Sequence, residues 1–338
     1  MRRVTLQHPK NYAIFIINEF KSFIIPEIMK IAYLILAHHQ PKQMIRLINA
    51  LNSTHVSFFI HVDLKCDIYL FNNFNYGANV VFINKRIVVN HSGFSQVRAM
   101  IKLIQTASAF DDFDYYIFLS GNDYPIKDNN YIYSYLKNNY PTNYISFYPL
   151  VEKADFISYI KKYYFLDFII NSPKYLHKPL WIMQWILGKV INNRPFIKGM
   201  IAYRGSTSWC LNKQTIEYII KFLESKKAII FIRFFKYVWD PDEIFFQTII
   251  LNSPFAEQCR FYNKNVNDSK LFLKNENKAY LHYINWDRDR EDPAIMNMSD
   301  LKLLKECDFL FARKFDESKS QELLASLDKY LNANIMLK

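Results

Sequence analysis

Three carboxylate side chains stand directly before an apolar stretch near the middle of the second half of the sequence. They are Asp240, Asp242 and Glu243, with Pro241 between the first two. The apolar residues that follow predict a helix that opens at Asp240. A carboxylate held at that position could act as a general base and remove a proton from a hydroxyl group. The spacing also fits a capping box with Asp240 as N-cap and Glu243 at N3, and the local residues alone favour this structural explanation.

Asp-x-Asp pairs can hold a divalent cation that bridges a diphosphate when the pair follows a strand. The sequence contains three such pairs, which are Asp112/Asp114, Asp240/Asp242 and Asp287/Asp289. The first pair precedes a predicted strand, and the second lies at the start of the predicted helix. The third alternates with Arg288 and Arg290, which would pair with the carboxylates or bind an anion themselves. We therefore predict no metal site.

A sheet must position these residues, because short apolar runs alternate with helical patterns in the first half of the chain. The predicted strands are residues 31–37, 56–63, 79–83 and 115–120, and the predicted helices between them are residues 41–51 and 95–107. Such alternation predicts an α/β fold with a buried parallel sheet. Polar residues follow three of the strands, namely His38, Asp63 and the pair Asn122-Asp123. Ligands bind at this edge of an α/β sheet, so we expect a ligand crevice there.

A basic and aromatic insertion of about residues 155–200 follows this half of the chain. Its lysines are interleaved with large apolar residues that include Trp181 and Trp185. Two interpretations stay open: an amphipathic helix in which residues 159–200 contact a membrane surface, or a helical insertion whose tryptophan face packs on the core. Farther along, we predict a long helix from Gln214, a polar loop at residues 263–277 and a C-terminal helix within residues 317–338. Residues 1–29 are expected to form an N-terminal extension.

Composition limits the class of protein. The chain has 338 residues, of which 51% are hydrophobic, so it can bury a large core in one main domain. A net charge of +12 indicates an anionic partner, which could be nucleic acid, a membrane surface or a phosphate-bearing substrate. Most aromatic residues lie inside the apolar strands and helices, so we expect no nucleic-acid partner. Charged residues and Pro26 interrupt the N-terminal apolar stretch, so we predict no spanning helix and a cytoplasmic protein, peripheral at the inner-membrane face.

Several segments, in order, resemble the successive motifs of one family. They are residues 31–38, 59–63, 120–127, 205–211, 241–246 and 311–316. The family is glycosyltransferase family 14, the core-2/I-branching β-1,6-N-acetylglucosaminyltransferases and peptide O-xylosyltransferases. The resemblance covers roughly residues 30–316. It implies a GT-A type α/β domain, in which a Rossmann-like central sheet is flanked by helices, with residues 155–200 as a helical insertion.

The resemblance also implies roles for single residues. Glu243 is similar to the catalytic base of the family, and Lys314 is similar to a ligand of the donor's diphosphate. A second diphosphate ligand corresponds to Arg288, with Arg290 as the alternative. Asp63 corresponds to a residue on the nucleotide side, near uracil or ribose. His38 is also expected to bind the sugar nucleotide. The matched motifs further imply substrate-binding roles for Asn122, Asp123, Ser208, Trp209 and Asp242.

The implied activity is an inverting, metal-independent transfer of a sugar from a UDP-sugar to a hydroxyl group, with no cofactor. The first donor expected is UDP-N-acetylglucosamine, giving a β linkage, and the alternative is UDP-xylose. The acceptor would be a glycan, a glycolipid or a lipid-linked oligosaccharide, as in the synthesis of bacterial surface polysaccharide or lipopolysaccharide. Two fixed cations could stabilise the leaving diphosphate without a metal. The alternative outside the enzymes is a basic protein that binds nucleic acid or a membrane surface.

Overall fold

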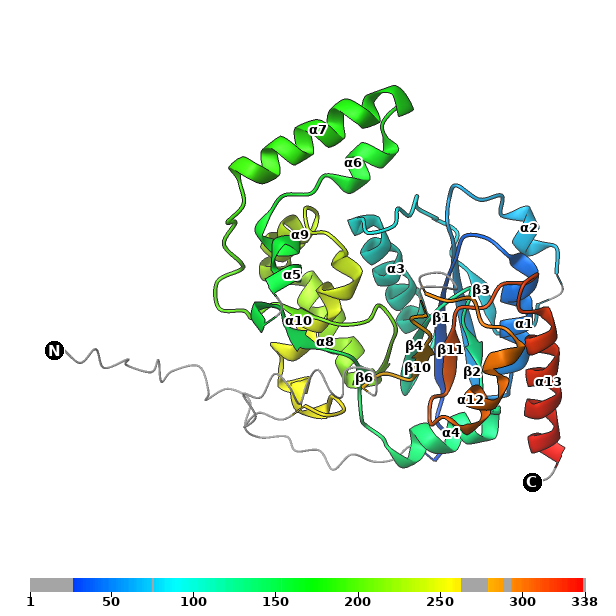
Figure 1. Cartoon of the computed structure of the whole chain (residues 1–338). Coiled ribbons are helices and arrows are strands. Elements are labelled where there is room, and N and C mark those ends of the chain that lie inside the picture. Colours follow the sequence, from blue (N-terminus) through cyan, green and yellow to red (C-terminus); the bar gives the residue numbers. More distant parts are fainter. Residues whose placement is uncertain (1–26, 75, 153, 263–278, 288–292, 337–338) are drawn as a thin grey trace.

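A six-stranded mixed sheet forms the centre of the molecule (Figure 1). The computed structural model describes residues 27–74, 76–152, 154–262, 279–287 and 293–336. The strand order is β3-β2-β1-β4-β9-β6, in which the first four strands are parallel and β9 is antiparallel to both of its neighbours. The strands are β1 (Ile31–Ala37), β2 (Val56–Val62), β3 (Val80–Phe82), β4 (Tyr115–Ser120), β6 (Tyr144–Ile145) and β9 (Trp209–Asn212).

Two helical layers cover this sheet (Figure 1). One face packs on the first of two hydrophobic cores, to which α1 (Pro41–Leu51) and α13 (Gln321–Met336) contribute. The other face packs on the second core, whose helices are α3 (Phe94–Phe110), α8 (Lys213–Glu224), α9 (Lys226–Phe235) and α10 (Phe245–Leu251). Helices α2 (Tyr69–Asn72), α4 (Asn129–Asn138) and α12 (Leu301–Glu306) also contribute buried side chains to the first core.

Burial on both faces explains the continuous apolar runs. In β1, Tyr33 and Ile35 point into the first core, whereas Ala32 and Leu34 point into the second. Successive side chains of a strand face opposite sides, so a strand that is covered on both sides has no position for a polar residue. Polar residues therefore begin only where β1 ends, at His38.

Two smaller sheets complete the fold. The parallel pair β10 (His282–Ile284) and β11 (Phe311–Arg313) is joined by β5 (Tyr124–Pro125), which is antiparallel to β11. This sheet carries the C-terminal part of the chain back beside the end of β4. The antiparallel pair of β7 (Tyr148–Pro149) and β8 (Tyr203–Arg204) lies at the base of the insertion, which connects the two strands.

The structure confirms the predicted α/β class, with helices on both faces of a central sheet. The bounds of β1, α1 and β4 are those expected from the sequence. The helix predicted from Gln214 is present as α8, which begins at Lys213, but it ends before Ser225, and α9 is a separate helix. Ser225 has an extended backbone, and its hydroxyl accepts a hydrogen bond from the Ala228 amide, as an N-cap does. The predicted loop at residues 263–277 and most of the N-terminal extension lie outside the described residues.

The insertion is helical, with α5 (Ala154–Lys161), α6 (Leu166–Asn171) and α7 (Lys174–Val190). Helices α6 and α7 form a hairpin that projects from the rest of the molecule (Figure 1). The side chains of Trp181 and Trp185 are 39% and 61% exposed, so the interpretation in which a tryptophan face packs on the core is wrong. Within the described residues, no helix has the length and apolar character needed to cross a bilayer.

Candidate active site

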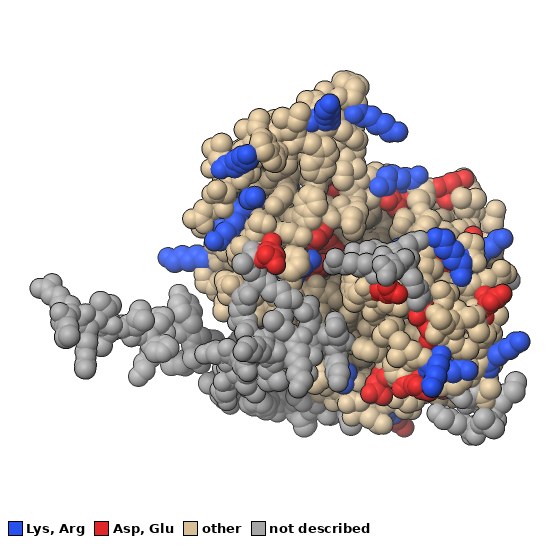
Figure 2. Space-filling view, in the orientation of Figure 1, with Lys and Arg blue, Asp and Glu red and all other residues tan. Residues whose placement is uncertain are grey.

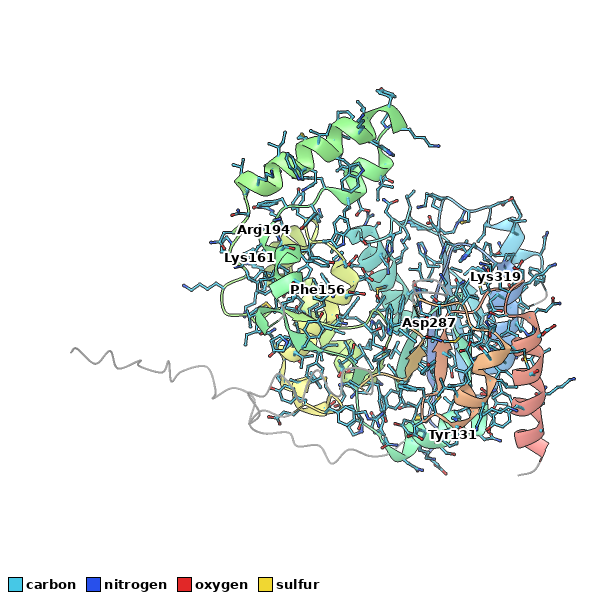
Figure 3. The ribbon with its side chains drawn as sticks, in the orientation of Figure 1. Tyr131, Phe156, Lys161, Arg194, Asp287 and Lys319 are labelled. Carbon is cyan, nitrogen blue, oxygen red and sulfur yellow. The ribbon has the colours of Figure 1, made fainter. Side chains whose placement is uncertain are left out.

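A cleft of about 1220 Å³ opens at the carboxyl ends of the parallel strands. His38 after β1, Asp63 after β2 and Asn122 after β4 all line it, as the strand pattern predicted. Figure 2 shows a hollow between the projecting insertion and the rest of the molecule, with acidic side chains inside it. In Figure 3, Phe156 and Lys319, which both line the cleft, lie on different sides of this region, with Asp287 between them.

Glu243 lies on one wall of the cleft. Residues 241–243 form a single 3-10 turn, and α10 begins only at Phe245. Asp240 has a left-handed backbone (φ 45°), and its side chain makes no capping hydrogen bond. The capping-box explanation is therefore wrong, because the Glu243 carboxylate turns toward Arg204 and not back to the Asp240 amide.

Arg204 is the counterion of this carboxylate cluster. One of its terminal nitrogens donates to Glu243 Oε2 and lies 3.7 Å from Asp240 Oδ2, and the other donates to the Tyr148 hydroxyl at 3.1 Å. The guanidinium carbon also lies 4.0 Å from the ring centre of Phe156. The Arg204 side chain is only 12% exposed. These contacts fix the guanidinium between the β7–β8 strand pair and residues 240–243, which we call the acidic turn.

Burial raises the pKa of Glu243 to about 8, although the Arg204 guanidinium acts in the opposite direction. The neighbouring carboxylates of Asp242 and Asp240 contribute to the rise. A short 3-10 turn supplies little of the dipole that would stabilise a carboxylate at a long helix, so burial dominates. A carboxylate with a raised pKa is a stronger base, which suits proton removal from an acceptor hydroxyl.

Asp242 lies beside Glu243 but is held by different partners. Its Oδ2 accepts hydrogen bonds from Gln96 Nε2 at 2.8 Å and Thr207 Oγ1 at 2.6 Å. Asp242 is 5% exposed, and its pKa is raised by burial. It therefore joins the start of α3 and the loop after β8 to the acidic turn, in addition to lining the cleft.

The loop after β8 passes close to the sheet at Gly205. A Cβ atom at this position would lie 1.9 Å from the Ser146 carbonyl oxygen, so only glycine fits. The Gly205 amide donates to the Glu243 carbonyl at 2.8 Å. This close approach sets the position of Arg204 on one side and of Ser208, which lines the cleft, on the other.

Cationic side chains line the cleft on a second wall. Arg313 and Lys314, at the end of β11, and Lys319 all face the cleft. The segment is fixed by Asn122, whose carbonyl accepts from the Phe315 amide at 2.8 Å and whose side chain donates to the Phe315 carbonyl at 3.1 Å. Asn122 therefore positions the cationic segment as well as lining the cleft.

Asp123 does not reach the cleft, contrary to its predicted contact with substrate. It is fully buried, and its Oδ1 lies 3.2 Å from an Arg313 terminal nitrogen. Its Oδ2 accepts from the Ser120 amide at 2.8 Å and lies 3.4 Å from His282 Nε2. Burial alone would raise the pKa of Asp123, but His282, Arg313 and the Ser120 amide hold it below its ordinary value. Asp123 thus acts through Arg313, which it anchors.

Trp209 also lies away from the cleft, because it belongs to β9 and points into the second core. Its side chain is 1% exposed, and its ring stacks on Phe118 with centres 5.5 Å apart. The predicted contact with substrate is therefore replaced by a packing role. Arg288 and Arg290, the predicted diphosphate ligands upstream of Lys314, lie outside the described residues.

Asp63, at the end of β2, is 3% exposed, and its carboxylate already has protein partners. Its Oδ1 accepts from the amides of Lys65 at 3.0 Å and Val89 at 3.2 Å, and its Oδ2 lies 3.4 Å from Lys65 Nζ. His38 is exposed, and its ring stacks on His39 with centres 4.0 Å apart. Both residues are placed to contact a ligand in the cleft.

In the first two Asp-x-Asp pairs, each carboxylate is bound by a different protein group. Asp112 and Asp114 lie at the start of β4, at the opposite end of the strand from Asn122; Asp112 pairs with Lys213 and Asp114 accepts from the Lys30 amide. Asp240 and Asp242 are engaged by Arg204 and by Gln96 with Thr207. Among the residues that the structure describes, no three His, Cys, Asp or Glu side chains are grouped as a metal ion would require.

Sequence reasoning missed Arg204 and Arg313. Arg204 directly precedes Gly205 in a matched motif, and Arg313 directly precedes Lys314 in another. No local pattern distinguishes them from surface arginines. Their partners, Glu243 and Asp123, are 39 and 190 residues away in the chain.

The fold and the cleft together define an α/β protein whose cleft combines a half-buried carboxylate of raised pKa with a cationic wall at the carboxyl ends of parallel strands. Residues 31–306 match the family Core-2/I-Branching enzyme, and the chain belongs to this family of glycosyltransferases.

Named relatives agree with the family. The chain is 27% identical to xylosyltransferase 2 of Rattus norvegicus over 317 residues, which cover 90% of this chain and 34% of the relative. It is 23% identical to xylosyltransferase 1 of the same species, with 91% and 36% of the two chains covered. The chain thus spans about a third of the length of these relatives. A solved structure of mouse xyloside xylosyltransferase 1 in its apo form aligns with 83% of this chain and covers 97% of its own chain. The TM-score is 0.32 and the identity is 11%, so this likeness supports no inference.

Proposed function

We propose that this chain transfers a sugar from a UDP-sugar to a hydroxyl group of a glycan or lipid-linked oligosaccharide, with inversion at the anomeric carbon. The observation that carries this proposal is the presence, in one cleft, of both the half-buried Glu243 carboxylate and the cationic wall of Arg313, Lys314 and Lys319. A base and a cationic anion-binding surface are the two elements that such a transfer requires.

In the proposed reaction, the acceptor oxygen attacks the anomeric carbon while the bond from that carbon to the UDP oxygen breaks. The acceptor proton passes to Glu243, and the electron pair of the broken bond leaves with UDP. Negative charge grows on the diphosphate during this step, so fixed cations stabilise the transition state more than the bound donor. Arg313 and Lys314 supply that charge, together with Arg288 or Arg290 by the family resemblance, and we propose that no metal is needed.

The donor is proposed as UDP-N-acetylglucosamine, with UDP-xylose as the second candidate. The first candidate rests on the resemblance to the family, whereas the names of the relatives, xylosyltransferases 1 and 2, favour xylose. Asp63 and His38 would contact the nucleotide, and Ser208, Asp242 and Asn122 are near enough to the cleft to shape the sugar and acceptor sites.

A panel of UDP-sugars tests the proposal without knowledge of the acceptor. Slow release of UDP from one donor, by transfer to water, is expected at a rate that exceeds that from the other donors. Thermal stabilisation by UDP should accompany it. A protein of the nucleic-acid-binding class would release no UDP from any donor and would show no stabilisation by UDP, and that result would overturn the proposal.

A further inference from the structure

Helix α7 carries its apolar side chains on the outside. Tyr175, Ile182, Trp185, Ile186 and Val190 are between 51% and 79% exposed. At 100° per residue, Tyr175, Ile182, Ile186 and Val190 fall within a sector of about 80° on the helix surface. A surface helix of a globular protein normally presents the opposite pattern, with its apolar stripe on the core.

The orientation of α7 is fixed from inside by a polar residue. Gln184 is buried, its side-chain oxygen accepts from the Phe165 amide at 2.9 Å, and its side-chain nitrogen donates to the Tyr163 carbonyl. Gly188, one turn later, is buried on the same side. Because Gln184 faces inward, its neighbours Ile182, Trp185 and Ile186 must face outward.

The exposed side of this hairpin is cationic as well as apolar. Lys174, Lys178 and Lys189 lie with Trp185 in an adjacent sector of about 60°. Lys189 Nζ lies 3.7 Å from the ring centre of Trp185. Figure 2 shows basic side chains on the projecting lobe.

No acidic side chain balances these lysines on α7. Between residues 163 and 200 the sequence has one acidic residue, Asp167. Its carboxylate is already occupied, because it accepts from the Ser95 amide at 2.8 Å, the Ser95 hydroxyl at 2.6 Å and Asn90 Nδ2 at 2.9 Å. Arg194, at the base of the lobe in Figure 3, is buried between Phe234 and Tyr163, so the exposed charge comes from the lysines.

We propose that the outer face of α7, formed by Tyr175, Ile182, Trp185, Ile186 and Val190 with Lys174, Lys178 and Lys189, docks on an anionic lipid bilayer. Tryptophan and tyrosine side chains suit the boundary between headgroups and acyl chains. Lysines on the flank place their amines among anionic headgroups while their methylene chains extend along the apolar layer. A second copy of this chain would bring the same lysines together, which is unfavourable without acidic partners on this face.

Hydrogen bonds link the insertion that carries α7 to the cleft. Asp167 on α6 binds Ser95 in the first turn of α3, and the adjacent Gln96 holds Asp242 in the cleft. If the proposed transferase activity is correct, docking through α7 would bring the cleft to the membrane surface. The acceptor hydroxyl would then be presented on a lipid-linked molecule. This consequence rests on the proposed function, whereas the docking itself does not.

Cosedimentation with vesicles tests the docking in the absence of any sugar nucleotide, so its outcome is independent of enzymatic activity. Wild-type chain should bind vesicles of phosphatidylcholine with 30% phosphatidylglycerol, a composition chosen for its negative charge, and binding should weaken with added salt. Vesicles of phosphatidylcholine alone should bind at least about tenfold less. Trp185→Ser with Ile186→Ser, and separately Lys178→Glu with Lys189→Glu, should each lower binding at least about tenfold.

The matched control is Tyr69→Ser with Leu70→Ser. Tyr69 and Leu70 in α2 are 70% and 57% exposed and lie on another side of the molecule (Figure 1). This variant should bind as the wild type does, and circular dichroism should show that all variants are folded. Absence of wild-type binding to anionic vesicles, or equal binding by the α7 variants, would overturn the proposal. Concentration-dependent dimerisation that the α7 variants abolish, without vesicle binding, would assign the face to a second copy.

Discussion

The ion pair between Arg204 and Glu243 gives a prediction that can be worked out in detail. Arg204 is the nearest cation to the proposed base, and it favours the charged form of Glu243. Replacing Arg204 with methionine keeps the side-chain volume similar but removes the charge. The half-buried Glu243 carboxylate would then lie beside Asp240 and Asp242 without its counterion, so its pKa should rise further.

The size of the effect follows from the pKa of about 8 in the native protein. At pH 7, roughly one tenth of the molecules would carry a charged Glu243. Loss of an adjacent opposite charge raises a carboxyl pKa by about 1 to 3 units. A rise of about one unit lowers the charged fraction at pH 7 by about tenfold, so kcat/KM should fall at least about tenfold at that pH. The deficit should shrink as the pH is raised above the new pKa.

The assay is the pH dependence of kcat/KM for UDP-sugar turnover, between about pH 6 and pH 10. Wild-type activity should rise with pH through the pKa of Glu243, because the base acts in its charged form. Arg194→Met is a matched control, since Arg194 is also buried over aromatic rings but lies outside the cleft lining. A uniform loss of activity at every pH in the Arg204 variant, with an unshifted profile, would refute the reasoning and make Arg204 a binding or packing residue.

Three further predictions concern the cations, the buried aspartate and the absence of a metal. Lys314→Ala and Arg288→Ala should each weaken UDP binding but leave uridine affinity nearly unchanged in calorimetry, with Arg290→Ala milder than Arg288→Ala; equal losses for both ligands would remove these residues from the diphosphate site. Asp123→Asn should lower the free energy of unfolding by about 3 kcal/mol in urea titrations, because it leaves Arg313 and His282 without their buried carboxylate. Because the pKa of Asp123 is lowered in the folded protein, its contribution to the free energy of unfolding should be complete above the ordinary aspartate pKa and should be lost as the pH falls through the folded pKa. An Asp123→Asn variant with unchanged stability at neutral pH would contradict this prediction. EDTA should leave turnover unchanged, whereas a complete loss restored by manganese would show that the transfer needs a metal.

Much of the fold could be predicted because its signals are local. Strand β1 is apolar along its whole length, and β4 is a run of aromatic and aliphatic residues that ends in Ser120, so the bounds of both were predictable from their apolar runs. The break between α8 and α9 was missed because Ser225 is compatible with a helix in sequence and acts as a cap only in its extended conformation.

The candidate site was predictable only in part, because its contacts join distant segments. His38, Asp63 and Asn122 follow strands that end at one edge of the sheet, so their meeting was foreseeable. The partner of Glu243 was not, because Arg204 reaches it from the end of β8, where the next residue, Gly205, lies too close to the Ser146 carbonyl oxygen for any other side chain. The strand pattern also could not show that Asp123 is buried and pairs with Arg313, whereas the preceding residue, Asn122, lines the cleft.

The direction in which the insertion faces was likewise open in the sequence. An amphipathic pattern in α7 fits burial of the tryptophans as well as their exposure. Gln184 decides between these outcomes through its hydrogen bonds to the segment before α6. Such a bond depends on a tertiary contact, which periodicity does not contain.

Replacement of Glu243 by glutamine tests the central claim most directly. The variant keeps the shape of the side chain but cannot accept the acceptor's proton. We predict that Glu243→Gln folds normally, binds UDP with an affinity close to that of the wild type and transfers sugar at least about a hundredfold more slowly. Asp240→Asn, a change at the neighbouring carboxylate, should reduce the rate much less. Near-normal turnover by folded Glu243→Gln would contradict the account, because Glu243 would then be only a structural partner of Arg204.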